Sequence, residues 1–380
     1  MDFDQKYMSA AIQLAEKGML SSFPNPSVGS LIVECDKKNK NDKIVGFGHT
    51  QKGGRPHAEV MAIKNVKFKK NKKYICYSTL EPCSHYGKSS PCAEKIAENP
   101  IDEVVFAFID PDKRVSGIGR NFLKEKGIKV RYGLLKQDLI NFYAGYFLNR
   151  IKNRPKVILK MATSIDGKIS YGNNSNKWIT NSLSRKYVHL QRAKNEAILI
   201  GSNTAKIDNP KLTCRLNGLK EFSPLRIIIN KNLDLSENLD IFNLSVSSTI
   251  IFTENTSKSR HSKFQNKNVK ILIIKKNKFF LKNILKEIAA LGVSNLIVEG
   301  GAKINSLFLK YNLVDILYIF RGNVFIGNKG LDLTSSNTNN VKFSENNFKL
   351  KKIFPLNDNH LEIYETRKYI EFISKVIEKY

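Results

Sequence analysis

Four residues from two separate segments have the types and spacing that hydrolytic zinc chemistry requires. His57 and Glu59 are one residue apart in "RPHAEV", and Cys83 and Cys92 enclose eight residues in "LEPCSHYGKSSPC". One imidazole and two thiolates are three ligands for a tetrahedral Zn²⁺, which leaves a fourth position for water. Because bound zinc lowers the pKa of water from about 15.7 to about 7, hydroxide forms at neutral pH, and Glu59 can carry the proton.

Each part of this pattern is weak by itself. His-x-Glu occurs by chance, and a glutamate is favoured in the first turn of any helix. The combination is more specific, because Pro82-Cys83 follows an expected strand and Cys92 begins an expected helix, where backbone N–H groups favour a thiolate. The pattern H-x-E…P-C-x-x-C marks zinc nucleobase deaminases, with that glutamate as general acid and base. Here eight residues rather than two separate the cysteines, so the intervening loop has room for substrate contacts.

Length and composition bound the class of protein. A chain of 380 residues predicts about two domains, since single cores rarely grow past ~250 residues. The N-terminal "MDFDQKYM" is acidic, and no apolar run approaches the ~20 residues of a membrane span. The five cysteines are an odd number and thinly spread, which argues against a disulfide framework. We therefore expect a cytoplasmic protein without a membrane partner.

The net charge of +29 raises the alternative of a nucleic-acid-binding protein. The lysines, however, are scattered through every segment alongside asparagine and isoleucine, and no basic stripe with interleaved aromatic residues is present. We interpret the charge as a compositional bias that also attracts an anionic substrate, and we expect no nucleic-acid partner.

The first half alternates strand and helix patterns, which predicts a layered α/β domain over 1–149. A helix is expected at 3–17, ended by "PNPSVGS", and another at 136–149. The segment "RIKNRP" at 150–155 is interpreted as a linker because it is charged, aperiodic and ends in proline. Between these helices we expect strands at 30–34, 43–48, 73–79, 103–109 and 129–134, and helices at 57–66, 92–98 and 117–126.

The second half, 156–367, predicts mostly parallel strands with crossover helices. The expected strands are the apolar runs "KVILKMATS", "AILIG", "RIIIN", "TIIFT", "KILII", "NLIVEG" and "ILYIF", with helices at 182–194 and 281–291. The polar segment 231–268 is not assigned. A final amphipathic helix is expected at 368–380, where Tyr369, Ile373, Val376 and Tyr380 share one face that packs on its own domain or on a partner subunit.

The best phosphate-binding candidate in the second half is "IVEGGAKINSLFL" at 297–309. A buried strand followed by two glycines and a helix lets the backbone approach a phosphate at the helix N-terminus. The same turn is common as plain structure, and "TSIDGK" at 163–168 is open to the simple interpretation of an Asp-Gly turn. Lys160 and Asp166 lie near this region, and the sequence leaves open whether either donates a proton.

Several stretches together resemble a known family, the bifunctional riboflavin-biosynthesis enzyme that pairs a pyrimidine deaminase with a reductase. In the first half these are "PNPSVG", "PHAEV", "LEPCSHYGKSSPC" and "DPDKRVSGIG"; in the second half they are "LKMATSIDGKIS", "KWIT", "QRAKNEAILIGSNTAKIDNPKLTCR" and "VEGGAKINSLFL". The long cysteine spacing is typical of that family. The resemblance covers about residues 3–366 and implies a cytidine-deaminase-like three-layer domain followed by a dihydrofolate-reductase-like α/β domain.

The resemblance also implies the reactions. One Zn²⁺ per chain would serve the deamination of 2,5-diamino-6-ribosylamino-4(3H)-pyrimidinone 5′-phosphate, with His57, Cys83 and Cys92 as ligands and Glu59 as the catalytic acid and base. NADPH would then reduce the ribosyl side chain to give 5-amino-6-ribitylamino-uracil 5′-phosphate. The partner is thus a small pyrimidine ribosyl phosphate, and we expect a homo-oligomer.

By resemblance, the remaining site residues fall into three groups. Deaminase substrate contacts would be Asn25, His49, His85 and Lys88. Reductase substrate contacts would be Asn176, Arg192, Leu212, Arg215 and Glu299, and guanidinium groups suit a sugar phosphate. Cofactor contacts would be Ala162, Trp178, Thr204, Asp208, Gly301, Ala302, Lys303, Ile304, Asn305, Ser306 and Leu307.

Plain structural interpretations stay open for several of these residues: a turn for Asn25, a solvated loop charge for Lys88, a helix-surface position for Arg192 and a core position for Trp178. The chain also departs from the family pattern. Ser27 stands where a second asparagine is usual, Asn176 replaces a serine, and "DPDKRV" replaces D-P-N-P-x-V. Two rival functions remain at this point, a nucleic-acid deaminase and a chain that keeps one activity only.

Overall fold

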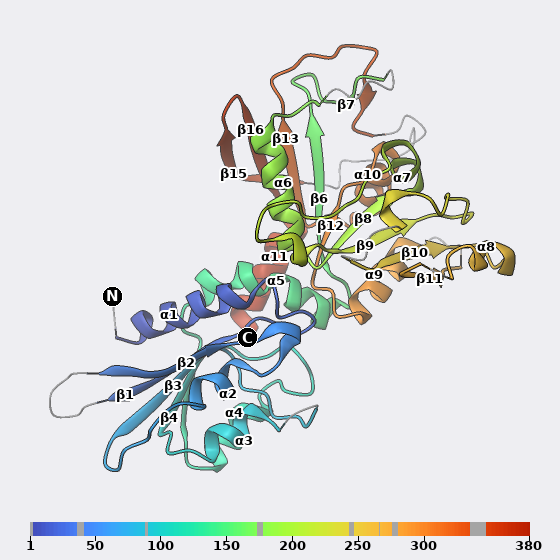
Figure 1. The fold of residues 1–380 in the computed structure, drawn as a ribbon. Coiled ribbons are helices and arrows are strands. Elements are labelled where there is room, and N and C mark those ends of the chain that lie inside the picture. The colour runs from blue at the N-terminus through green and yellow to red at the C-terminus, as the bar shows by residue number, and fades with distance from the viewer. Residues whose placement is uncertain are drawn as a thin grey trace. The chain divides into compact units, whose positions relative to one another are not determined.

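The computed structural model describes residues 3–35, 42–87, 90–172, 178–242, 247–265, 267–275, 280–334 and 347–380. These residues form two compact units, of which the first is Met1–Lys152 together with Ile373–Tyr380 and the second is Asn153–Phe372 (Figure 1). Among the helices of the described ranges, none combines the length and hydropathy that a membrane span needs.

The first unit is a five-stranded sheet with helices on both faces. Its strand order is β2-β1-β3-β4-β5, with β1 antiparallel to β2 and β3, and β3, β4 and β5 parallel. The strands are β1 (Gly29–Cys35), β2 (Lys43–His49), β3 (Lys73–Leu80), β4 (Glu103–Phe108) and β5 (Lys129–Tyr132). The helices are α1 (Phe3–Gly18), α2 (Ala58–Ile63), α3 (Cys92–Ala97), α4 (Ile118–Glu125) and α5 (Lys136–Lys152), with a short 3₁₀ turn at Lys52–Gly54.

Helices α2, α3 and α4 cover one face of this sheet, and α1 and α5 cover the other (Figure 1). On the first face, Ala62, Ile96 and Leu123 pack with buried residues of β1, β3 and β4. The layered architecture predicted from the alternating strands and helices is confirmed. It places the beginnings of α2 and α3 beside the end of β3, where the zinc-type residues were found in the sequence.

The predicted linker at 150–155 is wrong over its first three residues, because α5 continues to Lys152. The charge of Arg150 suggested a solvated segment, but its guanidinium lies 3.4 Å from Asp112 and 5.2 Å from the centre of the Tyr146 ring. Asn149 is buried beside it. A basic residue in the last turn also suits the negative end of the helix dipole, so α5 extends until Asn153, which has a positive φ.

The second unit is built on a nine-stranded sheet in the order β11-β10-β9-β8-β12-β6-β13-β16-β15. Every neighbouring pair from β11 to β13 is parallel, whereas β13–β16 and β16–β15 are antiparallel. The strands are β6 (Lys156–Thr163), β8 (Ala197–Gly201), β9 (Leu225–Ile229), β10 (Thr249–Thr253), β11 (Val269–Ile273), β12 (Asn295–Val298), β13 (Ile316–Arg321), β15 (Phe348–Leu356) and β16 (Asn359–Thr366).

The other elements of this unit connect those strands. The helices are α6 (Ser182–Lys194), α7 (Ser202–Asp208), α8 (Lys258–Ser262), α9 (Phe280–Ala290), α10 (Ala302–Lys310) and α11 (Arg367–Lys379). A separate two-stranded ribbon pairs β7 (Lys168–Ser170) with β14 (Leu331–Asp332), and 3₁₀ turns occur at Lys220–Phe222 and Asp240–Phe242. Within the segment 231–268, β10 is the strand expected at "TIIFT", and the part that was not assigned contains a 3₁₀ turn and α8.

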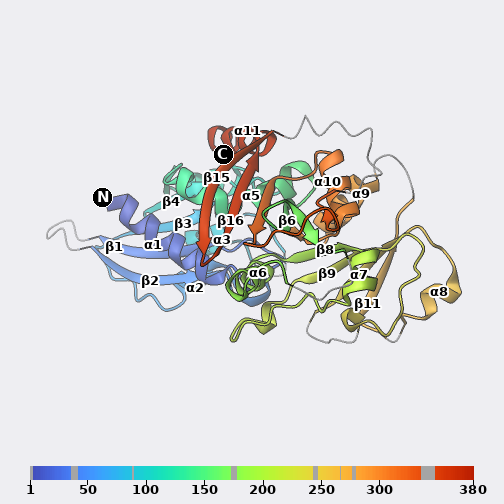
Figure 2. The ribbon, with the colours of Figure 1, turned by 90° about the horizontal axis from the view of Figure 1, so that it is seen from above.

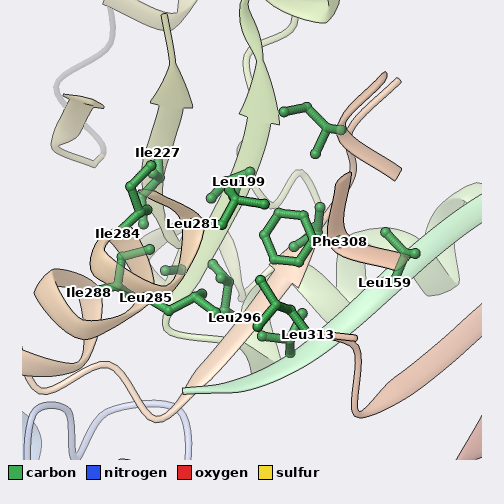
Figure 3. Packing of buried hydrophobic residues seen from close by; sticks show 14 of the residues in the cluster. Leu159, Leu199, Ile227, Leu281, Ile284, Leu285, Ile288, Leu296, Phe308 and Leu313 are labelled. Carbon is green, nitrogen blue, oxygen red and sulfur yellow. The ribbon is translucent and has the colours of Figure 1, made fainter. Parts of the chain in front are cut away.

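The main core of the second unit lies between the parallel strands and helices α9 and α10 (Figure 3). Leu281, Ile284, Leu285 and Ile288 recur at helical spacing on α9, and all four are buried. Burying a side chain of this size contributes about 1.5–3 kcal/mol relative to exposure. The apolar periodicity that predicted this helix is therefore also what holds it on the sheet.

The antiparallel pair β15–β16 was not predicted from the sequence. Figure 2 shows the two strands side by side at one edge of the sheet. The β15 sequence "FKLKKIFPL" carries three lysines and a register irregularity between Leu350 and Lys352, which breaks the alternation that identifies a strand.

The final helix is amphipathic as predicted, with Tyr369 and Val376 buried. Its last residues belong to the first unit. There the Tyr380 ring lies 5.4 Å from that of Phe147, and the Tyr380 carbonyl accepts a hydrogen bond from the Ile109 N–H. The tail therefore packs against its own chain.

Candidate functional site

Three elements bring the imidazole and the two sulfurs together in the first unit. His57 immediately precedes α2, Cys83 lies three residues beyond β3, and Cys92 is the first residue of α3. His57 Nδ1 is 3.2 Å from Cys92 Sγ and 3.4 Å from Cys83 Sγ, and all three potential ligand atoms lie within 4.8 Å of one another. The prediction that these residues converge is confirmed.

This arrangement fits a tetrahedral zinc ion. Zn–S bonds of about 2.3 Å and Zn–N bonds of about 2.0–2.1 Å place the nitrogen and sulfur atoms about 3.5 Å apart. The two observed N···S distances, 3.2 and 3.4 Å, are close to that value. The donor set of one imidazole and two thiolates is also one that zinc prefers. In the described part of the chain, it is the one cluster of this kind.

Hydrogen bonds among His57, Cys83 and Cys92 shift the pKa values of these three residues. The hydrogen bond to Cys83 raises the pKa of His57, against the opposing effect of burial. The Cys92 thiol and the Cys92 N–H, 3.3 Å away, both donate to the Cys83 sulfur and lower the pKa of Cys83. The pKa of Cys92 is raised in turn, because its thiol is held as the donor to Cys83. A bound cation favours both thiolates and removes this competition.

Glu59 lies in the first turn of α2 and is only 3% exposed. Its Oε1 accepts a hydrogen bond of 3.2 Å from the hydroxyl of Ser78, which is buried on β3. Burial raises the pKa of the Glu59 carboxyl, although the His57 charge opposes the shift. A carboxyl with a raised pKa is suited to taking up and returning a proton near neutral pH.

Of the predicted contacts for the deaminase substrate, Asn25 and His85 lie in loops, and His49 is the last residue of β2. The Asn25 amide donates to the Gly54 carbonyl at 2.9 Å, which fastens the first loop to the segment that leads to His57. His49 Nδ1 is 3.0 Å from the Thr50 carbonyl. Among the described residues, the buried Nδ1 of His85 has no hydrogen-bond partner. Lys88 lies outside the described residues, so its predicted role stays a prediction.

Glu81 is a further residue of this region that was not singled out in the sequence. Its buried carboxylate follows β3 and accepts hydrogen bonds from the N–H groups of Asp110, Gly117 and Arg120 at 2.9–3.1 Å. A Cβ at Gly119 would lie 2.2 Å from the Pro82 carbonyl, so α4 approaches the backbone next to Cys83 closely. Glu81 thus fastens the loop of 110–120 to the strand end that carries a zinc ligand. Only its position beside Pro82-Cys83 could have signalled this role.

In the second unit, Arg192, Glu299 and Lys160 form a buried ionic cluster. The Arg192 guanidinium donates two hydrogen bonds of 2.9 Å to the Glu299 carboxylate, and Lys160 Nζ lies 3.7 Å from it. Burial would raise the pKa of Glu299, but Arg192 and Lys160 outweigh it and lower that pKa to about 2. Arg192 is therefore not a simple helix-surface residue.

The loop beside this cluster contains two further predicted substrate contacts. Leu212 is buried and has a φ of +52°. Arg215 is exposed, and its N–H donates to His189 Nδ1 at 3.3 Å. The Arg192 guanidinium also donates to the Thr213 carbonyl at 3.3 Å. Arg192 therefore connects α6, the end of β12 and this loop.

The Gly-Gly turn lies between β12 and the N-terminus of α10, as predicted. The Gly301 N–H donates to the Thr204 hydroxyl at 3.1 Å, which fastens the turn to the beginning of α7. The N–H groups of Ile304 and Asn305 donate back to the Gly301 carbonyl. The other predicted residues of the turn differ in setting: Ala302 and Lys303 begin the helix, Ser306 donates to the Ala302 carbonyl, and Leu307 packs against the core.

The other predicted cofactor residues lie on β6, on α7 and in the segment before α6. Ala162 is near the end of β6, and Asp208 is the last residue of α7, where burial raises its pKa. Trp178 is 70% exposed rather than in the core, and the Arg185 guanidinium lies 4.8 Å from the centre of its ring. Asn176 lies outside the described residues.

The hydrogen bonds and burial of Asp166 and Lys160 shift the pKa values of these two candidate proton donors. Asp166 accepts hydrogen bonds from the Ser164 hydroxyl and from the N–H groups of Ile326 and Gly327, which lower its pKa to about 2. It is therefore ionised at neutral pH and has no proton to donate. Lys160 is held beside Glu299, and burial lowers its pKa.

Comparison with known proteins addresses both units. The family model described as the cytidine and deoxycytidylate deaminase zinc-binding region matches residues 1–108, and the RibD C-terminal domain matches residues 155–359. A zinc site in the first unit and a reductase architecture in the second define a two-domain deaminase and reductase.

Curated relatives and solved structures agree with that class. The riboflavin biosynthesis protein RibD of Aquifex aeolicus is 37% identical over 319 residues, which are 84% of this chain and 86% of that protein. The RibD of Buchnera aphidicola is 36% identical over 337 residues, which are 85% and 87%. A structure of Acinetobacter baumannii RibD is 28% identical, with a TM-score of 0.84 and coverage of 96% and 98%. The chain belongs to the RibD family of bifunctional riboflavin-biosynthesis enzymes.

These findings confirm the predicted fold class, the pairing of a zinc hydrolase with a reductase, and the requirement for Zn²⁺ and NADPH. A structure from Thermotoga maritima, 30% identical with a TM-score of 0.78 over 96% of this chain and 98% of that one, is described as a diaminohydroxyphosphoribosylaminopyrimidine deaminase and 5-amino-6-(5-phosphoribosylamino)uracil reductase. The nucleic-acid alternative gives no reason for the second of these activities.

Proposed function

We propose that the chain carries out two consecutive steps of riboflavin biosynthesis. The first is hydrolytic deamination of 2,5-diamino-6-ribosylamino-4(3H)-pyrimidinone 5′-phosphate. The second is reduction of the ribosyl side chain by NADPH, which gives 5-amino-6-ribitylamino-uracil 5′-phosphate. The observation that carries the proposal is the convergence of His57, Cys83 and Cys92 beside the buried carboxyl of Glu59.

In the deaminase domain, His57, Cys83 and Cys92 would hold Zn²⁺, which supplies a Lewis acid that makes water acidic near neutral pH. Glu59 removes one proton from the attacking water and delivers it to the pyrimidine ring. It then takes the second proton, from the hydroxyl now bonded to the ring carbon, and passes it to the departing ammonia. Ser78 keeps the carboxyl in place through its hydrogen bond. Asn25, His49, His85 and Lys88 are proposed to bind the substrate, with Lys88 at the phosphate.

In the reductase domain, NADPH supplies the hydride when bound. We assign its contacts to Ala162, Trp178, Thr204, Asp208 and the turn from Gly301 to Leu307, where the N-terminus of α10 suits a phosphate. Arg215 is proposed to bind the substrate phosphate, because Arg192 is already paired with Glu299. Glu299 stays ionised and can accept hydrogen bonds from sugar hydroxyls. Asn176, Arg192 and Leu212 complete the proposed substrate contacts.

The proposed domains are a deaminase at 1–149, a reductase at 156–367 and a C-terminal helix at 368–380. A homo-oligomer is proposed as well, since the edge strand β15 exposes the apolar side chains of Leu350 and Ile353. Thiolate ligands and NADPH chemistry both suit the reducing cytoplasm, which is the proposed location.

A coupled assay tests the function as a whole. Purified protein is given the diaminopyrimidine substrate, and ammonia release and NADPH oxidation are followed together. We expect NADPH oxidation to depend on prior deamination, and a zinc chelator to stop ammonia release while leaving reduction of the deaminated sugar phosphate intact. A chain that retains one activity only would show a single signal, and a nucleic-acid deaminase would show salt-sensitive RNA binding instead.

A further inference from the structure

The loops that follow β6 and β13 are fastened together by one carboxylate. These strands are parallel neighbours, so their carboxyl ends meet at the same edge of the sheet. Asp166, in the first loop, accepts hydrogen bonds from the Ser164 hydroxyl at 2.6 Å, the Ile326 N–H at 3.1 Å and the Gly327 N–H at 2.7 Å. Because two of these donors lie in the second loop, Asp166 fixes one loop on the other.

Backbone contacts continue this connection on both sides of Asp166. The Ile165 N–H donates to the Val324 carbonyl at 2.9 Å, and the Gly322 N–H donates to the Thr163 carbonyl at 2.7 Å. Further along, β7 pairs with β14, and Figure 1 shows β7 beyond the tip of β6. Gly172 has a φ of +82°, and a Cβ there would lie 2.1 Å from the Lys329 carbonyl. The two loops therefore form one structure, which we call the Asp166 flap (residues 163–172 and 322–332).

Two large apolar side chains of the Asp166 flap are exposed. Ile165 is 56% exposed and Phe325 is 74% exposed. They belong to neighbouring backbone stretches, since Ile165 is bonded to Val324 and the N–H of Ile326 is bonded to Asp166. The backbone bonds therefore carry both exposed apolar side chains on one well-bonded structure.

The position of this surface indicates its ligand. In open α/β sheets, ligands bind beyond the carboxyl ends of the parallel strands. The proposed cofactor contacts extend along that edge from α7, after β8, through the Gly301 turn, after β12, to Ala162 on β6, and β8, β12 and β6 are consecutive in the sheet. If the phosphates lie at the N-terminus of α10, one end of the dinucleotide reaches the end of β6, where the flap begins.

We propose that Ile165 and Phe325 are the apolar surface on which the nicotinamide ring of NADPH lies, and that Asp166 is the residue that positions this surface. The nicotinamide is the occupant because the reacting end of the cofactor must come close to Glu299 and Arg192, which lie on β12's carboxyl side and on α6. A flat ring with an apolar face suits an aliphatic and an aromatic neighbour. The flap would also exclude water from the hydride-transfer region. This inference rests on the proposed assignment of the cofactor contacts.

Binding measurements on the whole chain test the proposal. The variants are Ile165→Ser, Phe325→Ser and Asp166→Ala, with Phe47→Ser as a matched control, since Phe47 is an equally large exposed side chain at 66% exposure on β2. Two ligands are titrated, NADPH and 2′,5′-ADP, which lacks the nicotinamide half. Ammonia release by the same preparations reports that the first unit is folded, and 2′,5′-ADP binding reports the same for the second unit, which contains the flap.

We expect each flap variant to weaken NADPH binding by about tenfold, the equivalent of about 1.4 kcal/mol, and to leave 2′,5′-ADP binding and ammonia release unchanged. Asp166→Asn keeps one oxygen acceptor and should recover part of the affinity that Asp166→Ala loses. Equal weakening of both ligands, or of neither, would overturn the inference. So would a higher KM for the pyrimidine with an unchanged Kd for NADPH, because the surface would then serve the substrate. Failure of the wild-type chain to bind NADPH would overturn the cofactor assignment, and this inference with it.

Discussion

Two buried glutamates show how the same side chain takes opposite roles in the two domains. Glu59 is surrounded by the thiol groups and a single imidazole, and burial raises its pKa. The Glu299 side chain is also largely buried, at 8% exposure, but Arg192 and Lys160 lower its pKa to about 2. The raised pKa suits Glu59 to taking up and returning a proton, whereas Glu299 stays ionised and accepts hydrogen bonds. The surroundings of each glutamate set its pKa, and the pKa determines whether it serves as an acid–base residue or as a binding residue.

Replacing Glu59 by glutamine tests its role. Glutamine preserves the size of the side chain and an oxygen for the Ser78 hydroxyl, but it cannot carry a proton. We expect ammonia release to fall by about 10²- to 10⁴-fold, the usual contribution of a general acid–base group, with the zinc content unchanged. Reduction of the deaminated substrate by NADPH serves as the internal control. Retained ammonia release in Glu59→Gln would show that another group moves the proton.

The Arg192–Glu299 pair provides a second test at this scale. In Arg192→Met the Glu299 carboxylate keeps only the more distant Lys160, and removing one partner of a buried pair costs about 3–5 kcal/mol. Chemical denaturation should register that loss in the free energy of unfolding. The double variant Arg192→Met with Glu299→Gln should recover part of it, because the carboxylate charge is removed together with the guanidinium and only the Lys160 ammonium loses its partner. A cost below about 1 kcal/mol for the single variant would mean that Glu299 is far better solvated than its contacts indicate.

Among the elements, the helix N-termini and strand ends carry the chemistry. His57 and Glu59 lie at the beginning of α2, Cys92 begins α3, and Cys83 follows β3. A short shift of any of these elements would separate the zinc ligands. The residues that hold the loops between them are therefore as important to the site as the ligands, and Glu81 is the most highly connected example.

Glu81→Gln is expected to loosen the loop of 110–120. A glutamine side chain has one oxygen in place of two, so it cannot satisfy the N–H groups of Asp110, Gly117 and Arg120 together. Each buried donor left without a partner costs about 1–3 kcal/mol, which denaturant unfolding can measure. Glu98→Gln is the matched control, because that side chain is 58% exposed and its pairing with Lys95 is worth at most about 1 kcal/mol. Equal effects of the two substitutions would argue against an anchoring role.

The sequence predicted elements where a single periodicity dominates. The apolar runs of the second unit gave its parallel strands, and the 3–4 spacing of Leu281, Ile284 and Ile288 gave α9. The prediction from sequence failed where contacts with a residue or strand distant in the chain determine the secondary structure of a segment. Arg150 stays helical because its guanidinium pairs with Asp112 and lies over the Tyr146 ring. The segment β15 is a strand because β16 pairs with it despite its lysines.

For the sites, the zinc residues could be predicted because the chemistry needs particular residue types at close spacing, and the reductase contacts came through resemblance. Neither route identified Glu81 or the acceptor role of Asp166. Both carboxylates accept hydrogen bonds from backbone N–H groups. Nearly every residue type has such a group, so these donors cannot be recognised from the sequence. The hydrogen bonds that reveal them depend on tertiary structure alone.

At the scale of the whole molecule, one chain combines a zinc-dependent deamination with an NADPH-dependent reduction. Each candidate site lies within one unit, and each uses its own set of ionised groups. Both substrates carry a phosphate in the proposed scheme, and a chain of net charge +29 attracts such anions at long range. The second reaction still depends on the product of the first, so the zinc site controls the output of the whole enzyme.

X-ray absorption at the zinc edge of the purified protein tests that site most directly. Coordination by His57, Cys83 and Cys92 predicts two sulfur neighbours at about 2.3 Å and two nitrogen or oxygen neighbours at about 2.0–2.2 Å. Four sulfur neighbours would describe a closed structural site, and a protein purified without metal that binds none when zinc is supplied would have no hydrolytic centre. Either result would contradict the proposed deamination.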